Sequence, residues 1–371
     1  MMMKSKVTKG LAAILSVGIL FGSVTAHAEA EAENEAVETQ EDMNIEEQNS
    51  GINEEGHGPG NGEGTGPANR EGHGPGEGGA PMGRGNGNGG GGQAQTDPEL
   101  QAVIDETAPK FEQFTYTDEA TGITLEYSLY IPSEYDENAD TSYPMVMFIP
   151  DATGGGKSAS QIVEDYYGAA VWASDEDQSK HPSFVLVPAY TEVVTDDNWN
   201  ASEQLDATVG LIEFLTENYN IDTNRLYTTG QSMGCMSSLY LNSKYPDLFA
   251  ASLYVSGQWD ISVLEPLENQ SFFYVTAGGD AKASGGQDEV MALFDQDQVS
   301  YSYETWDAQS DDEQQNANVQ EMIDAGNTAN MIRFETGTVL SGENNMEHMA
   351  SFNYAYKISA LRDWFFTQSK A

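Results

Sequence analysis

The 371-residue chain is poor in cysteine, in basic residues and in long apolar runs. Its single cysteine, Cys235, excludes a disulfide bond within the chain. Only 15 lysines and arginines stand against 60 aspartates and glutamates, which gives a formal net charge of −45. A field of this sign repels nucleic acids and anionic polymers, so we expect no nucleic-acid partner. No apolar run is long enough to span a bilayer, so we expect no transmembrane segment.

The amino-terminal part of the chain has the pattern of an export signal followed by a linker. Three lysines precede a short apolar run over residues 11–21, and Ala26-His27-Ala28 offers small residues for cleavage. Residues 29–96 are acidic and then glycine-rich, a composition that predicts disorder. We therefore predict a signal peptide over 1–28, a disordered linker over 29–96 and one catalytic domain over 97–371. Such a chain is secreted and extracellular, and its linker suits loose association with a cell wall.

The stretch over residues 225–245 reads as a strand, a sharp turn and a helix. Four β-forming residues precede Gly230-Gln231-Ser232-Met233-Gly234, and apolar residues then recur at helical spacing. A serine at the apex of such a turn needs small neighbours two residues away on both sides, which Gly230 and Gly234 supply. The pattern predicts Ser232 as a nucleophile. The alternative is a Gly-Ser turn that only links a strand to a helix.

A nucleophilic serine needs a histidine base and an acid, which follow the serine in the order acid, then histidine, in this architecture. Of five histidines only His348 comes after Ser232, which makes it the predicted base. Asp280 directly follows the strand expected over 271–277 and is the predicted acid. Asp260 is the second candidate for the acid and Asp288 is the third.

The rest of the domain alternates between strands and helices, which predicts an α/β fold with a mostly parallel sheet and helices on both faces. The active site of such a sheet lies at the carboxyl ends of its strands. The polar segment 307–330 is ambiguous and is considered as an inserted cap. We expect a hairpin over 111–116 and 125–131, further strands over 144–149, 184–187, 250–256, 271–277 and 301–306, and helices over 158–172, 202–219, about 285–296 and 349–366.

The loop over 151–158 ends in Gly-Lys-Ser and looks like a phosphate-binding loop. Asp151 stands where that motif begins with glycine and would put a negative charge beside a phosphate, so we expect no nucleotide. The same loop follows the strand over 144–149, where this architecture supplies one backbone amide of an oxyanion hole. Ala152 is the predicted donor, and Met233, the residue after the serine, is the second.

These motifs together resemble the α/β-hydrolase superfamily over residues 111–367. The nearest likeness is to secreted esterases similar to polyhydroxybutyrate depolymerases and to feruloyl or acetyl-xylan esterases, which grade into prolyl-oligopeptidase-like peptidases. T-A-G-G-D at 276–280 looks like the H-G-x-x-D acid motif of that family. F-I-P-D-A-T at 148–153 looks like its L-H-G-x-x oxyanion strand, with Pro150-Asp151 in place of His-Gly. An Asp151 side chain that pointed inward would oppose a developing anion.

Two tryptophans and several acidic loops are further candidates for binding. Trp199 and Trp259 follow strands on the expected active-site side, where they either wall a substrate pocket or serve ordinary packing. The acidic pair 196–197 and the acidic run 311–313 could hold calcium, but solvated acidic loops are commoner. We therefore assign no metal and no cofactor. Cys235 is expected to be a small buried residue under the turn at Ser232.

The sequence thus predicts a secreted serine hydrolase that cleaves a small-molecule or polymeric carboxylic ester through an acyl-enzyme. The resemblance favours esters over peptides as substrates. The expected domains also include no separate propeller-like domain that would control the entry of peptides. Two alternatives stay open: a serine peptidase with the same triad, and a catalytically inactive surface binding module.

Overall fold

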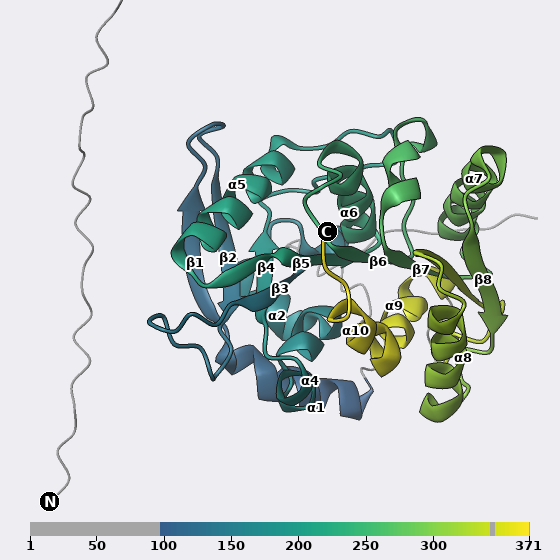
Figure 1. Cartoon of the computed structure of the whole chain (residues 1–371), viewed down its shortest axis with the longest axis horizontal. Helices are drawn as coiled ribbons and strands as arrows, with labels where there is room; N and C mark the ends of the chain where they lie inside the picture. The colour runs from purple at the N-terminus through teal and green to yellow at the C-terminus, as the bar shows by residue number, and fades with distance from the viewer. Residues whose placement is uncertain (1–96, 342–345, 371) are drawn as a thin grey trace, which may run out of the picture. The chain divides into compact units, whose positions relative to one another are not determined.

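The computed structural model describes residues 97–341 and 346–370, so the predicted signal peptide and linker lie outside the described residues. The described part contains a nine-stranded sheet in the order β1-β2-β4-β3-β5-β6-β7-β9-β8 (Figure 1). β2 pairs antiparallel with β1 and β4, and the other neighbours are parallel. This arrangement confirms the predicted α/β-hydrolase fold. Over the residues described, none of the helices has the length and apolar character that crossing a membrane requires.

The strands of the sheet centre are apolar runs that are buried on both faces. Every residue of β6 and β7 is buried, as the continuous apolar sequence of a central parallel strand predicts. The strands are β1 (Glu112–Thr117), β2 (Thr124–Tyr130), β3 (Tyr143–Ile149), β4 (Phe184–Ala189), β5 (Ile221–Gln231), β6 (Ala251–Val255), β7 (Phe272–Ala277), β8 (Tyr301–Trp306) and β9 (Ala329–Phe334).

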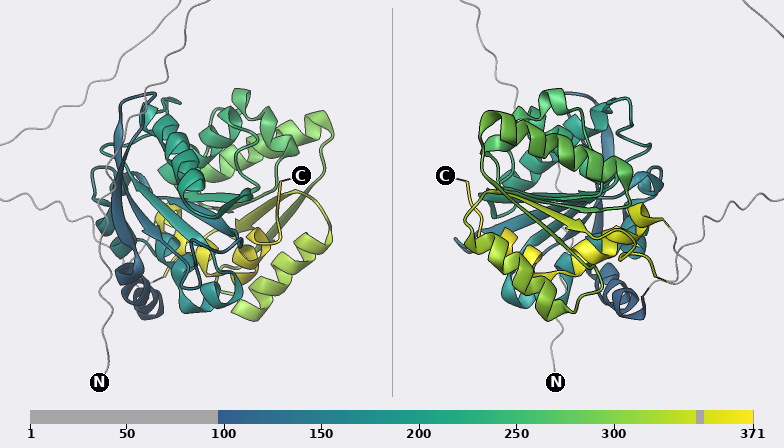
Figure 2. Two further views of the ribbon diagram at one scale, coloured as in Figure 1. Left: turned by 60° about the vertical axis from the view of Figure 1, so that its left-hand side comes forward. Right: turned by 90° about the vertical axis from the view of Figure 1, so that its right-hand side faces the viewer.

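Helices cover both faces of the sheet (Figures 1 and 2). α5, α6 and α7 lie on one face, and α1, α2, α4, α8, α9 and α10 lie on the other (Figure 1). The helices are α1 (Pro98–Thr107), α2 (Ala159–Asp165), α3 (Tyr167–Ala170), α4 (Asp175–Lys180), α5 (Glu203–Asn218), α6 (Met233–Lys244), α7 (Ala281–Asp297), α8 (Asp312–Asp324), α9 (Glu347–Lys357) and α10 (Ser359–Phe365). Short 3-10 turns cover Ala108–Lys110, Ala152–Gly154, Val171–Ala173, Ile261–Val263 and Glu265–Asn269.

Two helices that were predicted as continuous are broken. The helix expected over 158–172 is interrupted at Tyr166, whose φ of −120° and ψ of 112° are extended and separate α2 from α3. The helix expected over 349–366 is interrupted at Ile358, with φ −69° and ψ 101°, between α9 and α10. The carbonyls that this second break frees at Tyr356 and Lys357 accept hydrogen bonds from Nη1 of Arg362, at 2.5 and 3.2 Å. A buried guanidinium therefore takes the place of the missing helical donors.

The interpretation of residues 307–330 as an inserted cap is wrong. The segment forms α8 and leads into β9, which lies between β7 and β8 in the sheet. α8 buries only Gln315, Val319 and Met322, so its sequence shows little of the apolar periodicity of a packed helix. In β9 the charged Arg333 interrupts the apolar run, and the strand was not predicted. α1 and α4 were not predicted either.

Candidate active site

Ser232 occupies a sharp turn between the end of β5 and the start of α6. Its φ of 52° and ψ of −115° are strained for a residue with a side chain, as in the nucleophile elbow of hydrolases. Its amide donates to the carbonyl of Val255 at 2.9 Å and fixes the turn against the end of β6. A Cβ on Gly234 would overlap the Ile149 carbonyl, and one on Gly230 would overlap the backbone of Gly234. Both glycines are therefore required by close backbone approach.

The structure brings the three predicted catalytic side chains together. His348 Nε2 lies 2.8 Å from Ser232 Oγ, and His348 Nδ1 lies 2.6 Å from Asp280 Oδ2. The Asp280 side chain is 6% exposed and that of His348 is 30% exposed, so the acid is shielded while the imidazole is open to a substrate. These distances allow Nε2 to take a proton from the serine while Nδ1–H donates to the carboxylate.

The other two candidates for the acid are engaged elsewhere. Asp260 accepts from the amide of Ser262 and caps a short 3-10 turn. Asp288 pairs with Arg333 at 2.7 Å. Asp280 instead precedes α7, where its Oδ1 accepts from the amide of Ala283 at 3.3 Å. A helix amino terminus stabilises a negative charge, which suits a carboxylate that has to orient an imidazole.

The backbone of His348 is held by a chain of two serines. Ser351 Oγ donates to the His348 carbonyl at 2.8 Å and lies 2.7 Å from Ser256 Oγ. Ser256 directly follows β6 and has a φ of 48°, a strained value for serine. The Phe352 ring contacts the imidazole edge-on, with 5.1 Å between ring centroids. These contacts were not predicted, although Ser351 and Phe352 stand three and four residues after His348, on one side of a helix.

Ala152 and Met233 each begin a helical segment, the first a 3-10 turn and the second α6. The first amides of a helix have no carbonyl partner within it, so both N–H groups are available to a ligand. This placement agrees with a role as oxyanion donors, which stays a prediction.

The Asp151 carboxylate, next to Ala152, is buried and 4% exposed. Its Oδ1 accepts from the Thr153 amide at 2.8 Å, from Thr153 Oγ1 at 2.6 Å and from the Tyr166 hydroxyl at 3.0 Å. Its Oδ2 accepts from Gln231 Nε2 at 2.9 Å. Burial and the charge of Asp151 raise the pKa of Tyr166, which keeps that phenol neutral and able to donate. The carboxylate is therefore fully engaged by donors in the protein. Tyr166 and Gln231 carried no signal for this role in the sequence.

Cys235 lies under the elbow as a packing residue. Its side chain is fully buried, and a Cβ on Gly257 would contact it. Burial raises the pKa of the thiol, which makes it unreactive. The prediction of a small buried residue at this position is confirmed.

The two predicted tryptophans have different surroundings. Trp199 is 40% exposed, has a φ of 63° and stands in a turn whose backbone is held by Asp196. Trp259 is 4% exposed and packs edge-on against both Trp199 and Tyr240. Trp199 is thus available to a substrate, whereas Trp259 supports it from the core. The role of both in substrate binding stays a prediction.

Asp197, in the same turn, links the Trp199 segment to the acid side of the site. Its carboxylate accepts from Lys282 Nζ at 2.6 Å and from Gln258 Nε2 at 3.2 Å. Lys282 stands two residues after Asp280, at the start of α7. Across residues 97–341 and 346–370, no group of three or more His, Cys, Asp or Glu residues is arranged to hold a metal ion.

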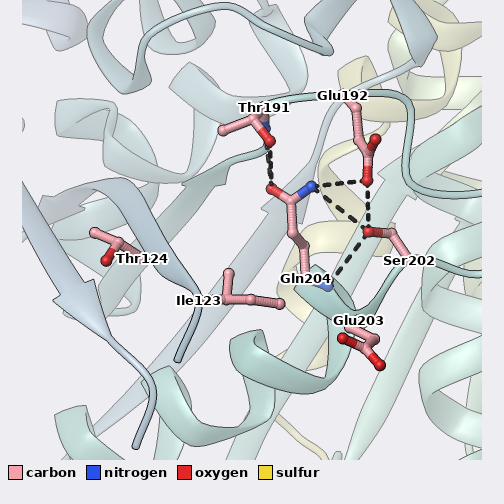
Figure 3. Close-up of a pocket in the computed structure, with 7 residues that line it drawn as sticks. All are labelled: Ile123, Thr124, Thr191, Glu192, Ser202, Glu203 and Gln204. Atoms are coloured by element: carbon pink, nitrogen blue, oxygen red, sulfur yellow. Dashed lines mark hydrogen bonds between the residues drawn. The ribbon is translucent and has the colours of Figure 1, made fainter. Parts of the chain in front are cut away.

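A surface pocket lies beside the segment that follows β4 (Figure 3). Gln204 crosses it, with Oε1 accepting from the Thr191 amide at 3.0 Å and Nε2 donating to Glu192 at 3.2 Å (Figure 3). The pocket is lined by Ile123, Thr124, Thr191, Glu192, Ser202, Glu203 and Gln204, none of which belongs to the predicted triad. The hydrogen bonds within its walls indicate a structural role.

The fold, the strained serine and the imidazole beside it define the chain as a serine hydrolase of the α/β-hydrolase class. The family model described as "Putative esterase" matches residues 119–359. The chain belongs to this esterase family and is thereby classed with the carboxylic ester hydrolases.

Individual relatives are more distant. Feruloyl esterase B of Talaromyces funiculosus is 25% identical over 142 residues, which are 36% of this chain and 36% of that protein. The chain therefore matches only about a third of the length of this curated relative. The crystal structure of a thermostable esterase aligns with a TM-score of 0.57 and 24% identity, over 72% of this chain and 64% of that one. The feruloyl esterase module from Clostridium thermocellum aligns with a TM-score of 0.47 and 15% identity, over 69% and 87%.

Proposed function

We propose that this chain is a secreted esterase in which Ser232, His348 and Asp280 hydrolyse a carboxylic ester through an acyl-enzyme. The observation that carries the proposal is the position of the His348 imidazole, 2.8 Å from Ser232 Oγ and 2.6 Å from Asp280 Oδ2. The three residues come from three separate segments of the chain: Ser232 follows β5, Asp280 lies after β7, and His348 lies in the first turn of α9. Such convergence on a strained serine supports a catalytic role over a structural one.

In the first half of the reaction Ser232 Oγ forms a bond to the ester carbonyl carbon as its proton passes to His348 Nε2. The carbonyl oxygen becomes an anion, for which the amides of Ala152 and Met233 are the proposed donors. Loss of one such donor costs about 100- to 1000-fold in rate. The carbon–oxygen bond to the alcohol then breaks, and His348 returns the proton to the departing alkoxide. The imidazolium that forms between these steps is stabilised by Asp280.

In the second half a water molecule attacks the acyl group on Ser232. His348 Nε2 takes a proton from the water, and the same pair of amides holds the second oxyanion. The bond to Ser232 Oγ then breaks, the serine regains its proton from His348, and the carboxylic acid leaves. The proton taken from water replaces the one that left Ser232 with the alcohol, so the protons balance over the two halves.

Membership in an esterase family supports esters as the substrate class. The similarity to feruloyl esterase B supports feruloyl esters within that class, with the exposed Trp199 ring as a surface for the substrate. The net charge of −45 disfavours polyanionic substrates. The export signal and linker expected over 1–96 support an extracellular location, and the linker suits loose contact with a cell wall.

One kinetic panel tests the proposal. Wild type, Ser232→Ala and His348→Ala are assayed with p-nitrophenyl acetate and butyrate, a feruloyl ester, acetylated xylan, a polyester and aminoacyl-anilides. We expect ester turnover by wild type only, with circular dichroism unchanged in the variants. Faster cleavage of the anilides would assign a peptidase instead. No turnover of any substrate would leave a binding module.

A further inference from the structure

Glu347 connects three segments at the candidate active site. Its Oε2 accepts from the amide of Gly279 at 2.7 Å, and its Oε1 accepts from the amide of Gly337 at 2.8 Å. Gly279 directly precedes Asp280, and Glu347 directly precedes His348. We propose that Glu347 is a positioning residue that holds His348 at the correct distance from Asp280. The proposal rests on the catalytic function given above.

The need for such a connection follows from the way the site is assembled. Asp280 lies after β7 and His348 is the second residue of α9, and the two are 68 residues apart in the chain. The hydrogen bond between them is the direct contact, but each side chain still depends on the position of its own backbone. A hydrogen bond between an ionised carboxylate and a backbone amide is about twice as strong as a neutral one. Glu347 places one such bond between the neighbours of the two catalytic residues.

The loop after β9 gives the carboxylate its second anchor. Gly337 has a φ of 87°, a conformation that favours glycine and turns its amide toward Glu347. The end of β9, from which this loop starts, is held against the acid segment, because the Gly278 amide donates to the Phe334 carbonyl at 2.8 Å. The carboxylate of Glu347 therefore accepts hydrogen bonds from two backbone segments that are also hydrogen-bonded to each other.

Gly279 supplies independent support for the proposal. A Cβ at this position would overlap the Glu347 carboxylate. Gly279 is not among the glycines with positive φ, so its backbone would accept alanine. A side chain at Gly279 would therefore displace the Glu347 carboxylate without straining the local backbone.

The first test compares Glu347→Gln with the matched control Glu335→Gln. The amide that replaces the Glu347 carboxylate keeps the size of the side chain but turns an NH₂ group toward one of the two backbone donors. Glu335 is exposed and lies in the same loop as Gly337, so its substitution removes the same charge nearby. We expect Glu347→Gln to lower kcat about 10- to 100-fold, because a displacement near 1 Å costs up to 100-fold. KM and the melting temperature should change little, and Glu335→Gln should behave as wild type.

The second test is a double-mutant cycle with Gly279→Ala and Glu347→Ala. Gly279→Ala alone should lower kcat as Glu347→Ala does, because the new methyl group displaces the carboxylate. In the Glu347→Ala background the same methyl group meets no carboxylate and should have no further effect.

Three results would overturn the proposal: wild-type kcat in Glu347→Gln, equal losses in Glu347→Gln and Glu335→Gln, or multiplying losses in the cycle. If Glu347→Gln does not fold, the kcat of Gly279→Ala and the double-mutant cycle still test the proposal. A failure of the catalytic function itself shows separately, as absence of Ser232-dependent turnover in wild type.

Discussion

Gln231 donates a hydrogen bond to Asp151 across 2.9 Å, and this bond connects the two strands that carry the proposed oxyanion donors. Gln231 precedes Ser232 and Met233 at the end of β5, and Asp151 precedes Ala152 after β3. Both side chains are at most 5% exposed, so the bond forms in a region of low polarity where it is strong. Asp151 is thus a buried anchor for the loop that carries Ala152.

We expect Asp151→Asn to impair both stability and catalysis. Its amide nitrogen would face donors from Thr153, Tyr166 or Gln231, and a buried donor left without an acceptor costs about 1–3 kcal/mol. The Ala152 amide should shift with the loop and lower kcat about 10-fold, a part of the effect of losing one oxyanion donor. Urea unfolding and steady-state kinetics measure the two effects. Asp165→Asn, an exposed carboxylate of α2 that pairs with Lys157, is the control. Wild-type behaviour of Asp151→Asn would contradict the anchor.

The two tryptophans should separate in their effects. Trp259→Ala removes a core side chain that is 4% exposed and should cost about 3–5 kcal/mol of unfolding free energy. Trp199→Ala removes an exposed ring and should change stability by less than about 0.5 kcal/mol. It should instead raise KM for aromatic esters and leave kcat for p-nitrophenyl acetate unchanged. Equal destabilisation by both variants would show that Trp199 is a packing residue.

A buried ion pair joins α4 to α10. Arg362 Nε and Nη2 donate to the Asp177 carboxylate at 2.6 and 3.0 Å, and both side chains are at most 5% exposed. Burial lowers the pKa of Arg362, but the hydrogen bond and charge of Asp177 more than offset this and raise it. The guanidinium is therefore charged in the folded state.

We expect Asp177→Ala to destabilise the fold by about 3–5 kcal/mol, because it leaves this buried charge without a partner. The double variant Asp177→Leu with Arg362→Met removes both charges but also the donor to the Tyr356 and Lys357 carbonyls, so it should recover only part of the loss. Urea denaturation measures the three stabilities. A double variant no more stable than Asp177→Ala would show that the unpaired charge costs no more than the hydrogen bonds from Arg362 to these two carbonyls.

The turn between β1 and β2 should make the free energy of unfolding depend on pH in the acidic range. Asp118 accepts from the hydroxyl and amide of Thr121 at 2.7 and 2.8 Å and from the Tyr116 hydroxyl at 3.1 Å. The hydrogen bonds from Thr121 outweigh burial and lower the pKa of Asp118 below its usual value of 3.8. The unfolded state therefore binds the proton at a higher pH than the folded state does. The stabilisation is present above pH 3.8 and is lost as the pH falls through the folded pKa.

Comparison with Asp118→Asn isolates this contribution. Wild type should be the more stable protein at pH 7, and the difference should shrink as the pH falls below 3.8, where the wild-type carboxyl also becomes neutral. Denaturant unfolding at a series of pH values measures the difference. A difference that stays constant over the whole range would show that the charge of Asp118 contributes nothing.

The fold was predictable wherever the sequence pattern is local. The apolar runs of β3, β6 and β7 directly indicate buried strands. The glycines around Ser232 directly indicate the backbone geometry of the turn. The breaks at Tyr166 and Ile358 were not predicted. Tyr166 donates to Asp151, 15 residues earlier, and the Arg362 guanidinium that caps the second break is itself held by Asp177, 185 residues away. The sequence of α8 is mostly polar, so neither this helix nor the strand that follows it was predicted.

The candidate site divides in the same way. Ser232 and His348 could be predicted from a motif and from the scarcity of histidine, and Asp280 from its place after a strand. Ser351 and Phe352 hold His348 from within one helical turn, but Glu347 and Gln231 could not be predicted, because each connects segments distant in sequence. Glu347 contacts Gly279 from 68 residues away, and Gln231 contacts Asp151 from 80 residues away. Only the folded chain shows these pairs.

Mass spectrometry of the protein labelled with a fluorophosphonate tests the central claim most directly. An activated serine reacts with this probe, whereas a serine in an ordinary turn does not. We predict a single adduct that peptide mapping places on Ser232, no adduct in Ser232→Ala, and labelling of His348→Ala that is slower by about 1000-fold or more. An adduct on another residue, no adduct on the wild type, or labelling of His348→Ala at the wild-type rate would contradict the account.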